Sequence, residues 1–267
     1  MHVPRKRFGQ HFLRDPLVIQ RIVDSIGPSR QDDMVEIGPG LGAITKPLLA
    51  RLARLEAIEI DRDAIAHLRQ EFGRTDADHG ELQIHEGDVL EFDLGTIANG
   101  RRLRLVGNLP YNISTPLLFK LIEQRQFIAD MHFMLQKEVV DRMAAKAGDD
   151  DYGRLSVMLA PWLQIEPLFD IGPGSFRPPP KVVSTFVRLT PFTSPPFELH
   201  DPKRYAALVA AAFSQRRKTL RNSLRALVSN EQIVAAGIDP GARAEVIAPA
   251  QFALLSGMPQ HDRLCVS

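Results

Sequence analysis

Short runs of apolar residues recur along the first two thirds of the chain, and most of them end at a glycine, a proline or an acidic residue. Runs of this kind, rich in Val, Ile and Leu, are typical of strands that are buried on both faces. They predict strands at residues 33–37, 55–60, 82–89, 103–106, 130–135, 164–171 and 182–189. Stretches with helical spacing separate several of these runs, so the sequence predicts an open α/β sheet.

Apolar residues at helical spacing predict helices at residues 16–26, 43–52, 115–123 and 138–145. In the first of these, Asp15 is the expected N-cap and Pro16 takes the first helical position. Its apolar side chains then fall on one face, namely Val18, Ile19, Ile22, Val23 and Ile26.

Beyond residue 190 the pattern predicts helices alone, at residues 201–213, 215–229, 231–236 and 249–256. The second of them combines an apolar stripe with a basic face. The stripe consists of Leu220, Leu224, Leu227 and Val228, and the face of Arg217, Lys218, Arg221 and Arg225. Many basic helix faces are only solvated surface, but such a cluster in a nearly neutral chain favours contacts with nucleic-acid phosphates.

The length of 267 residues allows one large and one small domain. Residues 191–202 are rich in proline, which is typical of a linker. We therefore expect a first domain at residues 1–190, the linker at 191–202 and a helical domain at 203–267.

Composition narrows the class of protein. Hydrophobic residues make up 44% of the chain and charged residues 24%, as in globular proteins, and the formal net charge is only +1. The single cysteine, Cys265, excludes internal disulfides and thiolate metal clusters. No motif supports a metal site or a serine hydrolase, and no apolar run suits a signal peptide or a membrane span, so we expect a cytoplasmic protein that needs no metal.

The strand at 103–106 runs into Asn108, Leu109, Pro110 and Tyr111, a loop at the end of a strand where α/β sheets place their chemistry. Asn108 offers a side-chain carbonyl, and Leu109 a backbone carbonyl beside a proline that cannot extend the strand. Tyr111 adds a flat ring. Two acceptors and a stacking surface suit adenine, which carries an exocyclic amino group. The alternative is a strand ended by proline with a tyrosine in the core.

A second cluster follows the first three predicted strands. Gly38 and Gly40 form a tight turn that allows a ligand to approach the backbone. Glu59 lies at the next strand end, about twenty positions on, where a carboxylate can accept from ribose hydroxyls. Asp88 lies at the third strand end and can accept from an adenine amino group. Helix caps or surface carboxylates are the simpler interpretation of each acid alone; their order along the chain points to a nucleoside.

The glycine turn also fits the dinucleotide fingerprint, which makes a hydride-transferring dehydrogenase an alternative. Pro39 inside the turn counts against it, as does the lack of a residue suited to a nicotinamide site. A ligand with adenosine but no pyrophosphate explains the carboxylates better, and S-adenosylmethionine is such a ligand.

Five motifs give the chain a resemblance to a known family. They are RKRFGQHFL (5–13), EIGPGLG (36–42), GD (87–88), NLPYNIS (108–114) and FRPPPKV (176–182). In this order they resemble the 16S ribosomal RNA adenine dimethyltransferases over almost the whole chain. FMLQKEV (133–139) and YGRLSV (152–157) look more like this branch than the 23S rRNA resistance methyltransferases. His11 stands where the family often has Asn.

The resemblance implies a Rossmann-like class I methyltransferase domain, S-adenosylmethionine as methyl donor, and N6,N6-dimethyladenosine as product. The modified bases would be two adjacent adenines in a hairpin near the 3′ end of 16S rRNA, in the small ribosomal subunit or its precursor. It also implies cofactor contacts from His11, Leu13, Gly38, Glu59, Asp88 and Asn108. The loop 108–111 would receive the adenine.

Three further expectations concern the RNA. Swinging a base out of its stack costs a few kcal/mol, and one aromatic ring returns about 1–3 kcal/mol, so two rings are expected. Tyr111 is one; Phe176 is the other, unless it only anchors its loop. Arg5, Lys6 and Arg7 are expected to contact phosphates, although a solvated tail is the alternative.

Two other functions remain open within this fold: a 23S rRNA adenine N6-methyltransferase and a non-catalytic rRNA-binding assembly factor. The intact loop 108–111 argues against the second. We expect the protein to be a monomer when it is off the ribosome, with no membrane partner.

Overall fold

The computed structural model describes residues 11–73, 80–110, 113–215 and 217–259. Four of the candidate site residues lie outside this part of the chain: Arg5, Lys6, Arg7 and Tyr111. Cys265 also lies outside it.

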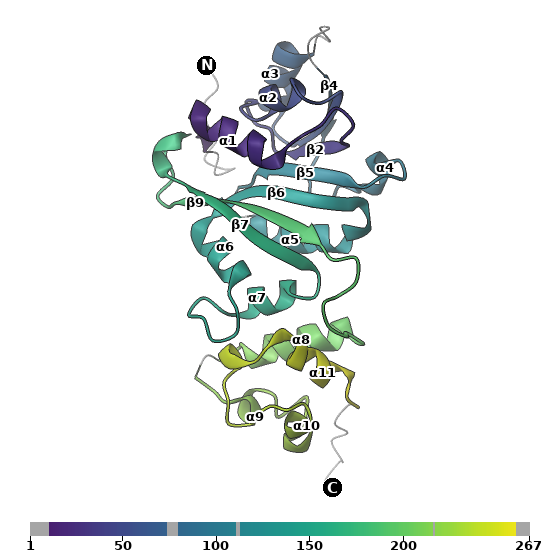
Figure 1. Ribbon diagram of the computed structural model, residues 1–267, viewed down its shortest axis with the longest axis vertical. Helices are drawn as coiled ribbons and strands as arrows, with labels where there is room; N and C mark the ends of the chain where they lie inside the picture. The colour runs from purple at the N-terminus through teal and green to yellow at the C-terminus, as the bar shows by residue number, and fades with distance from the viewer. Residues whose placement is uncertain (1–10, 74–79, 111–112, 216, 260–267) are drawn as a thin grey trace. The chain divides into compact units, whose positions relative to one another are not determined.

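A seven-stranded sheet forms the frame of the first two thirds of the chain (Figure 1). Its strands are β2 (Met34–Ile37), β3 (Arg54–Glu59), β4 (Glu81–Glu86), β5 (Leu103–Asn108), β6 (Ile128–Gln136), β7 (Leu163–Ile171) and β9 (Ser184–Pro191). Their order across the sheet is β4-β3-β2-β5-β6-β9-β7. The first five run parallel, and β9 pairs antiparallel with β6. All seven predicted strands are confirmed, and β5 continues two residues further than predicted.

A second, two-stranded sheet was not predicted. It pairs β1 (Phe12–Leu13) with β8 (Phe176–Arg177), which are far apart in the sequence. Two residues are too few to leave an alternating pattern, so this pairing has no local signal. It attaches the segment that follows residue 10 to the proline-rich motif at residues 176–182.

The helices of this part of the chain are α1 (Pro16–Ile26), α2 (Thr45–Leu49), α3 (Arg62–Phe72), α4 (Gly95–Ala98), α5 (Ser114–Glu123), α6 (Lys137–Ala144) and α7 (Arg154–Leu159). The prediction for α1 is confirmed down to its cap, because the Asp15 carboxylate accepts from the backbone N–H of Leu17 and Val18. The predicted helix 43–52 is present in a shorter form, with α2 assigned to Thr45–Leu49 only.

One face of the sheet packs against α1 and α2. Their buried residues meet strand residues that point to the same side, in a cluster that includes Ile22, Val23, Leu48, Met34, Leu55, Val106, Met134 and Phe186. Side chains alternate along a strand, so the pairing of Glu36 with Ala57 and Val106 places these three on that face as well. The same alternation brings Glu59 and Asn108, two residues further along their strands, to this side.

Residue contacts divide the chain into two compact units. The first comprises residues 1–140 and 165–191, and the second residues 141–164 and 192–267. Residues 141–164 belong to the second unit, and Val157 among them packs with its later helices. The boundaries given by the sequence stay a prediction.

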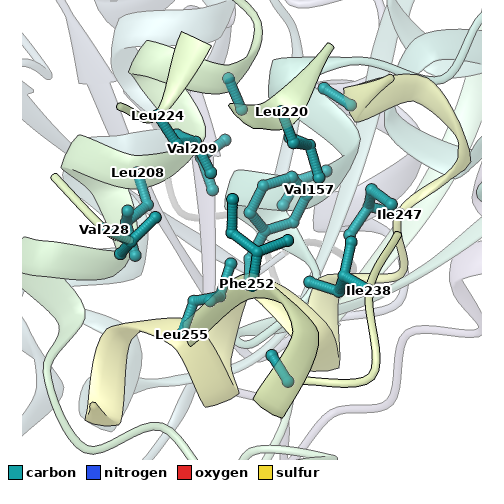
Figure 2. Packing of buried hydrophobic residues seen from close by; sticks show 14 of the residues in the cluster. Val157, Leu208, Val209, Leu220, Leu224, Val228, Ile238, Ile247, Phe252 and Leu255 are labelled. Atoms are coloured by element: carbon teal, nitrogen blue, oxygen red, sulfur yellow. The ribbon is translucent and has the colours of Figure 1, made fainter. Parts of the chain in front are cut away.

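The second unit has a core of its own (Figure 2). Its helices include α8 (Pro202–Ala212), α9 (Leu220–Ser223), α10 (Asn230–Ala235) and α11 (Pro249–Gly257). Val157 from α7 packs with Leu208, Leu224 and Phe252 in one cluster. Two buried tyrosines tie the unit together, since the Tyr152 hydroxyl donates to the carbonyl of Ile247 and the Tyr205 hydroxyl to that of Val157.

The continuous helix predicted at residues 215–229 is wrong. Of the described residues in this range only α9 is helical, because the N–H groups of Leu220 and Arg221 donate to the carbonyls of Ala242 and Pro240 instead of to a preceding turn. The predicted division of the side chains into a buried apolar stripe and an exposed basic face is nevertheless confirmed. Leu220, Leu224 and Val228 are buried, Leu227 is half-buried, and Arg217, Lys218, Arg221 and Arg225 are exposed.

Within the described ranges, no helix is both long and apolar enough to cross a membrane.

Candidate active site

A cavity of about 500 Å³ opens at the carboxyl ends of β2, β3 and β5. The chain runs from β2 to β3 and β4 on one side, and then returns to β5 on the other side of β2. Open α/β sheets bind ligands at such a reversal. The walls come from the turn after β2, the ends of β3 and β5, the loop after β4, and residues 11–14.

The structure brings nine predicted site residues to this one cavity. They are His11, Leu13, Gly38, Gly40, Glu59, Asp88, Asn108, Leu109 and Pro110. Residues that are far apart in the sequence thus line the same cavity, as the order of the motifs predicted.

The glycine turn shapes the floor. Gly38 and Gly40 have left-handed φ values of 65° and 57°. A Cβ on Gly38 would meet no other heavy atom within 4 Å, so it would project into open space at the cavity. A Cβ on Gly40 would come within 3.3 Å of the Phe12 ring. The glycines therefore keep the backbone accessible to a ligand.

Glu59 is held firmly by the backbone around it. Its carboxylate accepts from three N–H groups, those of Gly40 at 3.1 Å and of Ile60 and Asp61 at 2.9 Å each. A carboxylate has about four acceptor positions, so roughly one remains, on the oxygen that Gly40 contacts. This leaves about one acceptor position for a ligand, and the ribose contact of Glu59 stays a prediction.

Asp88 lies in the loop after β4 and is half-buried. One oxygen of its carboxylate accepts from the N–H of Leu90 at 2.9 Å, which fixes the side chain in a turn. Among the described residues nothing donates to its other oxygen, which is available to a ligand amino group.

Asn108 is oriented by the segment that precedes α1. Its amide nitrogen donates to the backbone carbonyl of His11 at 3.0 Å. A carbonyl only accepts, so this bond fixes which end of the amide is nitrogen and turns the amide oxygen away from His11. His11 is tied in turn by its ring nitrogen Nδ1, 2.8 Å from the carbonyl of Pro178.

Leu109 follows with a buried side chain, and its N–H donates to the carbonyl of Met134 at 3.3 Å. This bond holds the loop against β6. None of the described residues donates to the carbonyl of Leu109, so both acceptors that the sequence analysis identified are present at the cavity.

Phe176 does not line the cavity. Its side chain is only 5% exposed and belongs to the cluster beneath α1, while its backbone pairs with Leu13. In this structure the ring has the anchoring position that was the alternative to stacking. A stacking role would require the ring to leave this cluster.

Glu36 is a cavity residue that sequence reasoning missed. It lies in the middle of an otherwise apolar strand, is 2% exposed, and accepts from the Thr45 hydroxyl at 2.6 Å. Burial raises the pKa of Glu36 to about 7, helped by the charge of Glu59 and opposed by the Thr45 hydroxyl. The sequence did contain a signal for this site. It is an acidic residue inside an otherwise apolar strand, with a threonine nine residues later.

The cavity has the chemistry that S-adenosylmethionine requires. Acidic side chains outnumber cations on its walls, which suits a positively charged ligand, and apolar residues such as the 49% exposed Ile60 offer contact to a flat ring. The described residues include no group of three potential ligands that could hold a metal ion.

A Rossmann-like sheet with an acidic cavity beside a glycine turn, at the point where the strand order reverses, is the arrangement found in class I methyltransferases. The model of the family described as "Ribosomal RNA adenine dimethylase" matches residues 1–259, and the chain belongs to that family. Family membership implies S-adenosylmethionine as the methyl donor.

The names of close relatives agree with this family assignment. A protein named "Ribosomal RNA small subunit methyltransferase A" from Methylococcus capsulatus is 60% identical over 255 residues, covering 96% of this chain and 97% of that one. One of the same name from Pseudomonas aeruginosa is 51% identical over 96% of this chain and 94% of its own.

Two solved structures align with most of this chain. A dimethyladenosine transferase from Plasmodium falciparum aligns with a TM-score of 0.75 at 25% identity, over 92% of this chain and 96% of its own. The 23S rRNA methyltransferase ErmE aligns with a TM-score of 0.69 at 26% identity, over 92% and 98%.

Proposed function

We propose that this chain transfers methyl groups from S-adenosylmethionine to the N6 amino groups of two adjacent adenines in a hairpin near the 3′ end of 16S rRNA. The product is N6,N6-dimethyladenosine in the small ribosomal subunit. The identity to relatives named for the small subunit supports this substrate. The observation that carries the reaction is the orientation of Asn108 by His11 at the cavity.

The proposed mechanism depends on positioning. S-adenosylmethionine supplies a methyl group activated by its sulfonium. The adenine amino nitrogen is a weak nucleophile because its lone pair is delocalised into the ring. The Asn108 side-chain oxygen and the Leu109 carbonyl accept its two N–H groups, which favours sp³ geometry and directs the lone pair at the methyl carbon. The proton leaves after transfer, so no strong base is required.

Other residues of the cavity bind the cofactor. The turn at Gly38 and Gly40 brings the backbone close to the cofactor, Glu59 accepts from its ribose, and Asp88 accepts from its adenine amino group. His11 and Leu13 close the cavity from the segment before α1. Pro110 ends the strand, and Tyr111, which lies outside the described residues, supplies the stacking ring.

We assign the phosphate contacts to two basic segments. Arg217, Lys218, Arg221 and Arg225 are exposed, as such contacts require. Arg5, Lys6 and Arg7 form the second segment. We further propose that the enzyme acts in the cytoplasm, where its ribosomal substrate is assembled, and is a monomer when free.

Methyl transfer to defined particles tests this function. The wild type, given tritiated S-adenosylmethionine, should label the 16S rRNA of small subunits that lack the modification, two methyl groups on each adenine. Asn108→Ala should label neither adenine. Labelling of protein-free 23S rRNA in preference to small subunits would favour the resistance-type activity, and particle binding without any labelling would favour an assembly factor.

A further inference from the structure

Glu36 occupies an unusual place for a carboxyl group. It lies on the central strand β2, between Ala57 of β3 and Val106 of β5, with 2% of its surface exposed. Its oxygen Oε2 accepts from Thr45, and none of the described residues donates to Oε1. The side chain nevertheless lines the cavity, so this oxygen is available to a ligand.

The residues nearest Glu36 on β3, β5 and α2 carry no positive charge that would stabilise an ionised carboxylate. On β3, Glu59 lies two residues beyond its pairing partner and on the same side of the sheet, and its charge disfavours ionisation of Glu36. On β5 the matching position is the neutral Asn108, and on α2 the contact is the neutral Thr45. The other titratable or charged residues of the cavity wall are Asp88, His11 and Arg14. Without a cationic ligand, burial and Glu59 together favour the protonated form.

The two ligands of a methyl-transfer cycle differ by one charge. S-adenosylmethionine carries a sulfonium, whereas S-adenosylhomocysteine, the product, has a neutral thioether and the same amino and carboxyl groups. A positive charge in the cavity favours ionisation of a buried carboxyl in its wall, and the neutral thioether does not. The state of Glu36 therefore depends on which of them is bound.

We propose that Glu36 is a specificity-determining residue that gives up its proton to solvent when the sulfonium cofactor binds and takes it back when the neutral product remains. This inference rests on the proposed binding of S-adenosylmethionine in the cavity. The buried carboxylate then attracts the donor and not the spent product, which lowers product inhibition between the successive transfers that dimethylation requires.

Proton uptake and release during binding provide the test. Calorimetric titrations of the full-length protein with each ligand, in buffers of different ionisation enthalpy, give the number of protons released. With a pKa of about 7 for Glu36, S-adenosylmethionine should release about 0.9 proton at pH 6 and about 0.1 at pH 8, beyond what S-adenosylhomocysteine releases. The ratio of the two affinities should rise about tenfold between these pH values.

Three variants identify the group. Glu36→Gln should abolish the difference in proton release between the two ligands. Thr45→Val removes the donor that stabilises the carboxylate, so the release should persist to higher pH, a result that a purely structural role would not produce. His11→Asn replaces the histidine of the cavity wall and should leave the difference in proton release intact.

The outcomes separate the two proposals. Tight binding of S-adenosylmethionine with equal proton release for both ligands would overturn the role of Glu36 and leave the function in place. Loss of the difference in His11→Asn, with retention in Glu36→Gln, would assign it to the histidine and also overturn the inference. No binding of S-adenosylmethionine to the wild type would refute the proposed function itself.

Discussion

Three glycines with left-handed backbones allow the cofactor-binding role of the turn to be separated from its role in folding. Gly38, Gly42 and Gly100 have φ values of 65°, 81° and 77°. A Cβ on Gly38 or Gly100 would meet no heavy atom within 4 Å, whereas one on Gly42 would lie 2.6 Å from the Phe72 ring and 3.3 Å from Leu68. Only Gly38 among the three lines the cavity.

The expected costs follow from these contacts. Replacement by alanine forces a side chain into the left-handed region at all three sites, at about 1–2 kcal/mol each. Gly42→Ala adds the cost of overpacking, about 1–3 kcal/mol, and nearer the lower value because Phe72 is half-buried and its ring can shift. We therefore expect losses of about 1–2 kcal/mol for Gly38→Ala and Gly100→Ala, and about 2–4 kcal/mol for Gly42→Ala.

Ligand binding should follow a different order. The new methyl group of Gly38→Ala occupies the cavity, so affinity for S-adenosylmethionine should fall at least about tenfold, which corresponds to about 1.4 kcal/mol. Gly100→Ala is the matched control and should bind normally. Urea unfolding gives the stabilities and isothermal calorimetry the affinities. The reasoning is refuted if Gly38→Ala binds as tightly as Gly100→Ala, or if Gly42→Ala is no less stable than the other two.

Three further changes test other parts of the account. Asn108→Ala removes the amide oriented by His11, so the rate of methyl transfer should fall by about a hundredfold or more, measured at saturating cofactor; a smaller loss would contradict the positioning mechanism. Burial lowers the pKa of His132 to about 4, helped by nearby arginines, so its contribution to stability is complete above about pH 6.5 and is lost as the pH falls toward 4. His132→Asn should flatten the dependence of unfolding free energy on pH in this window, and an unchanged profile would show that another group is responsible. Replacing Arg221 and Arg225 by alanine should reduce the slope of log K against log salt for rRNA binding by about 1.4–1.8, and an unaltered slope would remove this segment from the interface.

The strands were predictable because each has a strong local signature. Apolar runs that end in glycine, proline or an acidic residue predicted all seven strands of the sheet. The helix expected at 215–229 had an equally clear apolar stripe, yet hydrogen bonds from Leu220 and Arg221 to a distant loop replaced its first turns. Tertiary contacts of this kind decide where a helix begins, and the local pattern does not contain them.

The site was predictable to a different extent for each of its residues. Residues at strand ends converge because parallel strands bring their carboxyl ends to one edge, which the order of motifs already implied. The role of Glu36 depends on burial and on Thr45, and the position of Phe176 on its pairing with Leu13. Both are long-range properties that a single sequence does not display.

The register of three parallel strands underlies the whole site. Glu36 faces the cavity because it pairs with Ala57 and Val106, and Asn108 shares that side because it lies two residues after Val106. A shift of β5 by one residue would turn Asn108 to the opposite face of the sheet. At the other end of β5, Arg104 binds Asp130 at 3.0 Å, and it also binds Asp32 at 2.7 Å and the carbonyl of Ile26 at 2.8 Å. The ion pairs at this edge therefore help to fix the register of the strand that carries Asn108, through residues that do not line the cavity.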